Sequence, residues 1–377
     1  MKKIIVLGAG MVGRAIAIDL CKEFEVTSAD IDKQNLSLLK KFPIKTVRCD
    51  LSSSEKIKSL VKKFDLVIGA VPGFMGFKTL QTVIRARKNV VDISFFAEDP
   101  FKLDALAKKM SVTAIVDCGV CPGLSNIILG YHNKQMQIDS YECMVGGLPS
   151  KKEWPYKYKA FFSPSDVIEE YTRPARIIVN GKMIIKEAMS DPELIEFDEV
   201  GTLEAFNTDG LRSLLTTMKI PEMIEKTLRY PGHIELMKIF RETGFFSHDE
   251  IEFSGKKIKP IELTSKLLFP FWQPDEDEDE FTLMKIKIAG GKSDQKKIIE
   301  YVLLDRSDMK TKTSSMARTT GYTCTSAARL ILEGKFSRKG ICPPEFIGEE
   351  DGCFDKIISL LDERNIKVAL INESMHN

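Results

Sequence analysis

The sequence has almost no net charge and no long apolar segment. Its 55 Lys and Arg residues balance 54 Asp and Glu residues, which leaves a formal charge of +1. A balance this close gives no support to nucleic-acid or membrane-surface binding, because both depend on an excess of positive charge. No apolar run reaches the roughly 20 residues that a membrane-spanning helix needs. With 43% hydrophobic and 29% charged residues, the composition is typical of a soluble globular protein.

The sequence also lacks a cysteine framework. Its eight cysteines are scattered, which is typical of reduced thiols and predicts a cytoplasmic protein. Cys118 and Cys121 are spaced as C-x-x-C, but no second pair stands at zinc-ribbon spacing, so we expect no metal. A redox pair is one interpretation, because a helix start follows and lowers thiol pKa values. We favour small residues in a loop that leaves room for a ligand. Met1 to Lys3 lead straight into a strand without a cleavage site, so we expect no signal peptide.

A glycine-rich turn near the start of the chain is the feature around which the rest is organised. Ile4 to Leu7 reads as a strand, the turn Gly8-Ala9-Gly10-Met11-Val12-Gly13 follows, and residues 15–20 read as a helix. Gly8 permits a tight turn, Gly10 lets the backbone approach a pyrophosphate, and Gly13 lets the helix pack closely on the strand. The first helical turn, with Met11 and Val12, offers N–H groups and partial positive charge to phosphates. The turn lies between a strand and a helix, and this context predicts a dinucleotide site.

Charge at the end of the second predicted strand indicates which dinucleotide is bound. Residues 25–29 form that strand, and Asp30 ends it. Its carboxylate can accept hydrogen bonds from a ribose 2′-OH and would repel a 2′-phosphate. The nearest cation along the chain is Lys33. We therefore predict NAD rather than NADP as the cofactor.

The βα rhythm continues to about residue 130 and predicts a Rossmann-type doubly wound parallel sheet. Further strands are expected at 45–50, 66–71, 89–94 and 113–117, with helices between them. In such sheets ligands bind beyond the carboxyl ends of the strands. The residues expected there to contact the cofactor, besides the glycine turn and Asp30, are Asp50, Leu51, Val71, Pro72, Ser94 and Gly119.

The pattern then changes to that of a second, α+β domain with a mixed or antiparallel sheet. Asn180-Gly181 between two apolar runs predicts a hairpin, and residues 282–289 and 298–304 read as antiparallel partners. The acidic run Asp275 to Glu280 is expected to be a solvated loop. From Thr313 the chain returns to helices. At 377 residues two domains are expected, a discontinuous one at 1–130 and 313–377 and a second at 131–312.

Several segments resemble the saccharopine dehydrogenase-like oxidoreductases over nearly the whole chain. They are the glycine turn, Gly119 to Asn126, Thr227 to Gly232, and Arg318 to Arg329. Within that family, residues 171–176, 201–210 and 231–235 look most like the L-lysine 6-dehydrogenases. The resemblance implies NAD-dependent oxidative deamination of the lysine ε-amine. The products would be an aldehyde that cyclises to piperideine carboxylate, ammonia and NADH. It also implies a homodimer joined through the sheet of the second domain.

Two departures from the relatives concern substrate size. Saccharopine reductases and carboxynorspermidine synthases have an Asp where Cys121 stands, and the reductases grip a substrate carboxylate with an Arg where Ser165 stands. The absence of this Asp and this Arg from the chain favours a small amino acid over a bulky condensed substrate. Two alternatives stay open: a reductive condensation enzyme of the saccharopine or carboxynorspermidine type, and a non-catalytic NAD-binding protein.

Candidate residues for the chemistry follow from residue type and place. Asp92 and His233 are the candidate acid–base groups, because each can exchange a proton with an amine. Arg173 and Arg229 are candidates to hold the substrate carboxylate, since a guanidinium fork matches it. For each of these four, an ordinary structural role is the alternative. The other residues expected at the substrate are Phe95, Cys121, Ser165, Asn207, Thr208 and Asp209.

Overall fold

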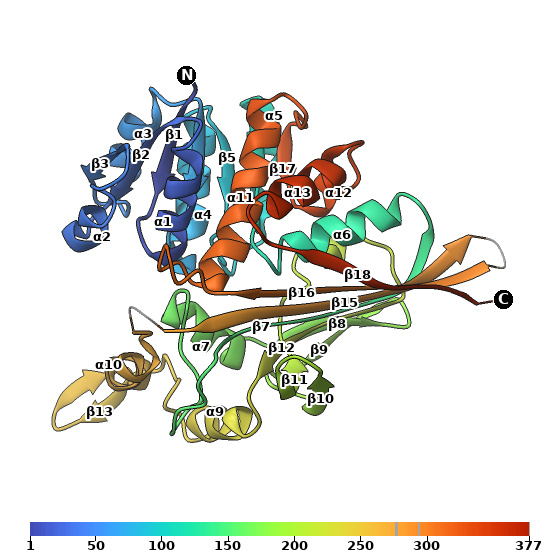
Figure 1. The fold of residues 1–377 in the computed structure, drawn as a ribbon. Helices are drawn as coiled ribbons and strands as arrows, with labels where there is room; N and C mark the ends of the chain where they lie inside the picture. Colours follow the sequence, from blue (N-terminus) through green and yellow to red (C-terminus); the bar gives the residue numbers. More distant parts are fainter. Residues whose placement is uncertain (276–277, 293–294, 377) are drawn as a thin grey trace. The chain divides into compact units, whose positions relative to one another are not determined.

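The structure is a computed structural model that describes residues 1–275, 278–292 and 295–376. The chain divides into two compact units (Figure 1). The first unit comprises Met1–Gln137 and Met316–Lys367, and the second comprises Ile138–Ser315 and the residues from Val368 onward. No described helix combines the length and the hydropathy of a membrane span.

A seven-stranded parallel sheet forms the centre of the first unit. Its strand order is β17-β6-β5-β4-β1-β2-β3, so the order reverses beside β1, as in doubly wound folds. Both β1 and β4 are apolar and buried, which is expected of parallel strands covered on two faces. The predicted Rossmann-type sheet is confirmed. The strands are β1 (Lys3–Leu7), β2 (Glu25–Asp30), β3 (Ile44–Arg48), β4 (Leu66–Gly69), β5 (Asn89–Asp92), β6 (Thr113–Ile115) and β17 (Gly340–Cys342).

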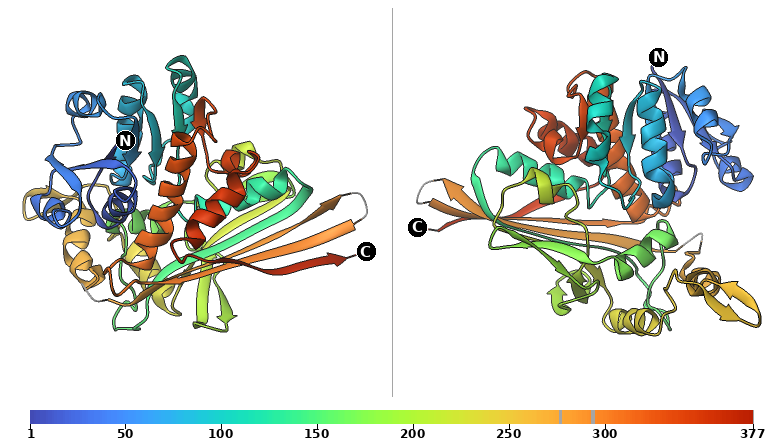
Figure 2. Two further views of the ribbon diagram at one scale, coloured as in Figure 1. Left: turned by 45° about the horizontal axis from the view of Figure 1, so that its top comes forward. Right: turned by 180° about the vertical axis from the view of Figure 1, so that it is seen from behind.

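Helices lie on both faces of this sheet (Figures 1 and 2). One face carries a core to which α3, α4 and α5 contribute Val61, Leu80 and Ala107. On the other face α11 packs on α1, because Gly321 lies against Ile16. The helices of the unit are α1 (Met11–Leu20), α2 (Lys33–Ser37), α3 (Ser54–Val61), α4 (Gly73–Arg85), the 3-10 turn Pro100–Leu103, α5 (Asp104–Lys109), α6 (Leu124–Asn133), α11 (Ser315–Leu332), α12 (Glu345–Gly348) and α13 (Cys353–Asp362).

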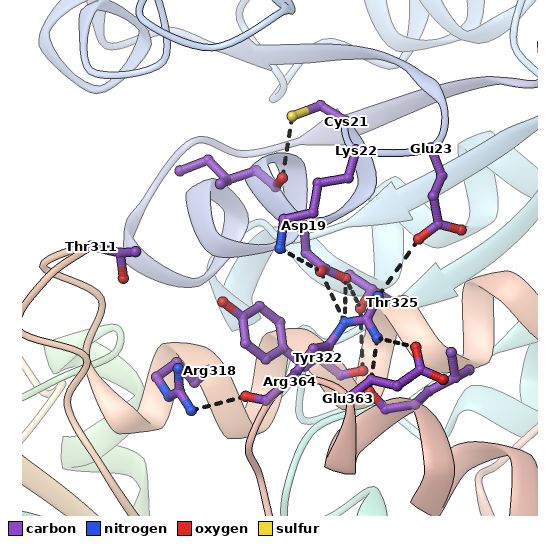
Figure 3. A network of polar contacts seen from close by, with 12 residues as sticks. Asp19, Cys21, Lys22, Glu23, Thr311, Arg318, Tyr322, Thr325, Glu363 and Arg364 are labelled. Atoms are coloured by element: carbon purple, nitrogen blue, oxygen red, sulfur yellow. Dashed lines mark hydrogen bonds and ion pairs between the residues drawn. The ribbon is translucent and has the colours of Figure 1, made fainter.

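A buried ion-pair cluster fastens the late segment of the chain to α1 (Figure 3). Asp19 of α1 is 1% exposed, and its carboxylate lies 2.9 Å from both Arg329 Nη1 and Arg364 Nε. Thr325 Oγ1 donates to the same carboxylate at 2.7 Å. Burial acts to raise the pKa of Asp19, but the two guanidinium groups outweigh it and hold the pKa below its usual value. The charge is therefore fully matched inside the unit.

A nine-stranded mixed sheet forms the second unit. Along its main path the order is β10-β11-β12-β7-β15-β16-β18, with β8 joining β12 to β9. The pair β7·β12 is parallel, whereas β15 and β16 are antiparallel over their length, as predicted. The strands are β7 (Gln137–Pro149), β8 (Ala175–Val179), β9 (Lys182–Lys186), β10 (Glu193–Phe197), β11 (Gly201–Asn207), β12 (Glu222–Arg229), β15 (Glu280–Lys292), β16 (Gln295–Arg306) and β18 (Val368–His376).

The predicted Asn-Gly hairpin is confirmed between β8 and β9. Asn180 and Gly181 both have positive φ, 50° and 72°, as the preferred two-residue turn requires. The remaining elements of the second unit surround an aromatic core that contains Tyr171, Phe206 and Trp272. They are α7 (Pro164–Thr172), α8 (Leu214–Thr217), α9 (His233–Glu242), α10 (Pro260–Trp272) and the small hairpin β13 (Ile251–Phe253) and β14 (Lys256–Ile258).

The end of the chain differs from the expectation that 313–377 returns to the first domain. β18 pairs antiparallel with β16 and belongs to the second unit, so the chain passes between the units three times. The partner of this strand lies about 70 residues earlier in the sequence, so no local pattern indicates the pairing. In the acidic run, Glu276 and Asp277 lie outside the described residues. For Glu280 the solvated-loop prediction is wrong, because this residue begins β15 and is fully buried.

Candidate functional site

The glycine turn after β1 combines glycines that the fold needs with one that it leaves open. Gly8 has a φ of 111°, and a Cβ there would lie 2.1 Å from the Ala70 carbonyl oxygen. A Cβ on Gly13 would lie 2.3 Å from the Gly8 oxygen, so the helix could not pack as closely. A Cβ on Gly10 meets nothing within 4 Å. Gly10 caps α1 without a side-chain hydrogen bond, so the N–H groups of Met11 and Val12 lie at an uncapped helix start that suits phosphate.

Asp30 is held in place at the carboxyl end of β2. Its carboxylate accepts from the Ala9 N–H at 2.6 Å and from the Asp32 N–H at 2.9 Å. The register of β2 and β3 also pairs Asp30 with Arg48, whose Nε donates to the Ile31 carbonyl at 3.1 Å. Arg48 is distant from Asp30 in the sequence, but the pairing of the two strands brings it beside this carboxylate. Arg48 thus places a positive charge beside Asp30, which weakens the preference for NAD that Asp30 alone indicates.

The other predicted cofactor residues follow strands of the parallel sheet at the edge where the glycine turn lies. Asp50 and Leu51 come after β3, Val71 and Pro72 after β4, and Gly119 after β6. Asp50 accepts from the Ser52 N–H and hydroxyl at 3.0 and 2.6 Å, which stabilises its own turn. Leu51 and Val71 are mostly buried in the core, 7% and 6% exposed. Cofactor contact by these residues stays a prediction.

Asp92 is a fully buried carboxyl at the end of β5. Its Oδ1 accepts from the Ser94 N–H at 2.8 Å, and the Ser94 hydroxyl lies 3.5 Å from Oδ2. A Cβ on Gly69 would lie 1.9 Å from Oδ2, so that glycine makes room for the carboxyl. Burial raises the pKa of Asp92 to about 8, against the lowering effect of the Ser94 hydrogen bonds. A group with this pKa can give or take a proton near neutral pH.

The two cysteines of the C-x-x-C segment differ in their surroundings. Cys118 is fully buried, and burial raises the pKa of its thiol far above the usual range. Cys121 is only half-buried. A low-pKa redox thiol needs the opposite environment, so the structure favours the small-residue loop interpretation over the redox pair. Phe95, like Cys121, is half-buried beyond the carboxyl ends of the strands.

In the second unit, His233 is enclosed at the start of α9. The Arg229 Nε donates to the Tyr171 hydroxyl at 3.0 Å, which leaves the Tyr171 O–H to donate to His233 Nε2, also at 3.0 Å. We therefore assign the other proton to Nδ1, which donates to the Tyr156 carbonyl at 2.8 Å. Burial and the charge of Arg229 lower the pKa of His233 to about 3. A neutral imidazole with both nitrogens bonded suits a positioning role better than proton exchange.

Arg229 and Arg173 each have a carboxylate partner within the unit. Arg229 is 2% exposed, with Nη2 2.5 Å from Glu170 Oε2 and Nη1 donating to the Leu228 carbonyl. Each of its three guanidinium nitrogens thus already donates a hydrogen bond within the unit. Arg173 lies 3.0 Å from Glu169. The structural alternative therefore suits Arg229, whereas substrate contact by Arg173 and by Ser165, an exposed residue in the first turn of α7, stays a prediction.

The predicted substrate segment Asn207 to Asp209 begins at the last residue of β11. The side chain of each of its three residues forms hydrogen bonds within the unit. Asn207 Nδ2 donates to Ser190 Oγ at 3.1 Å and to Asp191 at 2.8 Å. The two carboxylate oxygens of Asp209 each accept from Arg176 at 2.8 Å. Thr208 Oγ1 lies 2.6 Å from Glu225 Oε2 and 2.8 Å from Thr227 Oγ1. The structure thus brings these three residues into one fixed loop.

Glu225 on β12 is a candidate residue that the sequence analysis missed. It is 4% exposed, and its Oε2 also accepts from the Gly210 N–H at 3.0 Å. Burial raises the pKa of Glu225 to about 8, with Glu170 and Asp209 acting in the same direction. A signal was present, because Glu225, Thr227 and Arg229 alternate along the strand and so place polar groups on one face.

Comparison with known proteins matches nearly the whole chain to one family. Residues 4–115 match the model described as saccharopine dehydrogenase NADP binding domain, and residues 119–366 the model described as saccharopine dehydrogenase C-terminal domain. The mitochondrial alpha-aminoadipic semialdehyde synthase of Rattus norvegicus is 26% identical over 278 residues, which are 69% of this chain and 30% of that protein. This chain therefore spans less than a third of that relative.

Two further relatives match over most of their length. Saccharopine dehydrogenase [NADP(+), L-glutamate-forming] of Saccharomyces cerevisiae is 22% identical over 91% of this chain and 94% of its own. Carboxyaminopropylagmatine dehydrogenase of a Synechocystis species is 19% identical over 90% and 92%. A solved structure of the apo yeast saccharopine dehydrogenase covers 100% of both chains with a TM-score of 0.77 and 19% identity, which shows a shared fold.

Proposed function

Because the chain belongs to the saccharopine dehydrogenase family of oxidoreductases, we propose that it oxidises an amino acid at an amine-bearing carbon, with L-lysine and its ε-amine as the substrate. In the proposed reaction lysine, NAD⁺ and water give the ε-aldehyde, ammonium, NADH and one proton. The ε-aldehyde then condenses with the α-amine of the same molecule, which releases water and closes the ring. The observation that carries the proposal is the buried Asp92, held by Ser94 at the same sheet edge as the glycine turn.

The residues of the first unit fit a dinucleotide. A pyrophosphate would lie against the uncapped start of α1 beside Gly10, where the turn leaves space. When bound, the nicotinamide supplies the hydride acceptor. Asp92 would take the proton from the ε-ammonium, because only a neutral amine can be oxidised. Ser94 would keep that carboxyl oriented through its N–H and hydroxyl.

Asp30 supports NAD as the cofactor, and Arg48 supports NADP as the alternative. Asp30 presents a fixed carboxylate at the end of β2, which suits ribose hydroxyls and repels phosphate. Arg48, its cross-strand partner, is exposed and could bind a 2′-phosphate. The curated relatives from Saccharomyces cerevisiae and Pyricularia oryzae are named for NADP. Titration of the wild type and of Asp30→Ser and Arg48→Ser with each cofactor decides which of the two groups controls the choice.

Lysine as substrate rests on the resemblance and on Cys121 and Ser165. Those two positions lack the groups that the larger condensed substrates of the relatives need. Cleavage of saccharopine is the second candidate reaction, because two curated relatives that cover this chain well carry that name. A homodimer is part of the proposal, and the edge strand β9 supports it, since Met183 and Ile185 are 56% and 64% exposed there.

The experiment is a steady-state assay of reduced-cofactor formation with purified protein and both cofactors. The substrates are L-lysine, L-ornithine, saccharopine and cadaverine. Lysine is expected to give the highest kcat/KM, with piperideine carboxylate as the product. Turnover of saccharopine alone would replace the proposal with the second candidate. Tight cofactor binding without turnover of any amine would leave a non-catalytic binding protein.

A further inference from the structure

Glu225 on β12 is a buried carboxyl group for which the described residues provide no matching cation. The buried Arg229 is paired with Glu170, and the buried Asp209 is paired with Arg176, so these two buried charges are each matched by an ion pair. Glu225 lies among them at 4% exposure and forms no ion pair with any described residue. A buried carboxyl without a cation is costly once it is ionised. A ligand that brings a positive charge would remove this cost.

Of the two carboxyl oxygens of Glu225, Oε2 accepts hydrogen bonds within the described part of the unit and Oε1 does not. Oε2 accepts from the Thr208 hydroxyl at 2.6 Å and from the Gly210 N–H at 3.0 Å. The described residues provide no hydrogen-bond donor to Oε1. A Cβ on Gly210 would lie 2.3 Å from the Glu225 carboxyl, so the absence of a side chain at 210 lets the loop close over this group. The carboxyl is fixed in position and still has capacity to bind.

We propose that Glu225 is the recognition group for the α-ammonium of the substrate amino acid. This inference deepens the proposed function and rests on it. Of the two amines of lysine, the one that is oxidised must be neutral, whereas the other remains an ammonium and needs an anion. An ammonium donates to a carboxylate in a charge-assisted hydrogen bond, which is among the stronger polar contacts in proteins. Thr208, in the same predicted substrate loop, orients the acceptor.

Binding of this ammonium is coupled to the release of a proton. Burial raises the pKa of Glu225 to about 8 in the free protein, and Glu170 of α7 and Asp209 of the adjoining loop add to the rise. The hydrogen bonds from Thr208 and Gly210 oppose it. Arg229, on the same strand, is engaged with Glu170. Below pH 8 the carboxyl must therefore lose its proton when it accepts the ammonium, so one proton leaves for each substrate bound.

The test compares L-lysine with ε-aminocaproate, which is lysine without its α-amine, in the wild type and in Glu225→Gln. Glutamine keeps an oxygen for Thr208 and Gly210 but carries no charge. We expect the KM for lysine to rise roughly tenfold to a hundredfold with little change in kcat. The KM for ε-aminocaproate should not change. Glu222→Gln is the matched control, since that carboxylate lies on the same strand but accepts from the Asn180 N–H at the surface, and its loss should not change the KM for either compound.

Calorimetry with bound cofactor gives a second readout that does not require turnover. In buffers of different ionisation enthalpy, lysine should release about one proton more from the wild type at pH 7 than from Glu225→Gln, because only the wild type has a carboxyl at position 225. An unchanged lysine KM, or an equal loss for both compounds, would overturn the proposal. If the wild type does not turn lysine over but still binds it with this proton release, the proposed reaction fails and the recognition site stands.

Discussion

Each unit of this protein contains two kinds of buried carboxyl group, and the comparison separates structure from chemistry. In the first unit Asp19 is neutralised by Arg329 and Arg364, while Ser94 is the partner that the described residues give the Asp92 carboxyl. In the second, the buried Asp209 is paired with Arg176, while the described residues give Glu225 a hydroxyl and an N–H but no ion pair. Burial raises the pKa of both Asp92 and Glu225 to about 8. We infer that the matched charges stabilise the fold, and we propose that the unmatched carboxyls exchange protons and bind ligands.

The largest expected effect comes from neutralising the unmatched carboxyl of the first unit. In Asp92→Asn the amide cannot take a proton, so kcat should fall by roughly a hundredfold to ten-thousandfold. Cofactor affinity and the thermal midpoint should stay near those of the wild type, because no ion pair is broken. Steady-state kinetics and cofactor titration measure both. Retention of more than a tenth of the activity would put Asp92 among the structural carboxyls.

Removing a carboxyl group that is matched by cations should lower the stability of the fold instead. Asp19→Ala leaves two buried guanidinium groups with less negative charge, so the free energy of unfolding should fall by about 3–5 kcal/mol. Chemical denaturation measures this loss. Lys22→Ala is the control, because Lys22 also pairs with Asp19 but its side chain is 63% exposed, and its loss should be under about 1 kcal/mol. Equal losses in the two variants would mean that burial does not decide the strength of this cluster.

The buried imidazole of His233 in the second unit should make the stability of the fold depend on pH in acid. The pKa of His233 is lowered from 6.5 to about 3, so between these values the unfolded chain binds a proton that the folded chain does not. Stability should therefore rise with pH from 3 to 6.5 and be lost as pH falls through this window, by about 1.4 kcal/mol per unit at most. His233→Gln should flatten this slope, whereas the exposed His248→Gln should not. An unchanged slope in His233→Gln would show that the imidazole is charged when folded.

The smallest effect expected separates two glycines of the turn. Gly10→Ala adds a methyl group where nothing lies within 4 Å, so the thermal midpoint should not change while cofactor affinity falls severalfold. Gly13→Ala pushes a methyl group against the Gly8 carbonyl and should cost about 1–3 kcal/mol of stability. Thermal unfolding with and without cofactor distinguishes them. The reverse pattern would mean that the open side of the turn is not where phosphate binds.

Local patterns in the sequence predicted those parts of the fold that are themselves local. The glycine turn, the buried parallel strands and the Asn180-Gly181 hairpin all depend on neighbours within a few residues. β18 was misplaced and β17 was missed, because a three-residue strand and a distant partner leave little local signal. The ends of parallel strands gather by topology, which is why Asp92 could be expected at the sheet edge.

Charge matching, in contrast, depends on contacts that the sequence does not reveal. Arg229 suited a carboxylate-binding role by residue type, yet Glu170 and Tyr171 already use its donors. Arg48 escaped notice because only the register of β2 and β3 brings it to Asp30. Glu225 is distinguished from the other acidic residues by its burial and by the lack of an ion pair with any described residue. Such residues are identified by what surrounds them.

The most direct test of the central claim is to follow deuterium from lysine into the reduced cofactor. The protein is incubated with cofactor and with lysine deuterated either at the ε-carbon or at the α-carbon, and the cofactor is analysed by mass spectrometry. We predict that label from the ε-carbon appears in the reduced nicotinamide and that label from the α-carbon does not. Label arriving from the α-carbon, or no labelled cofactor from either compound, would contradict the account.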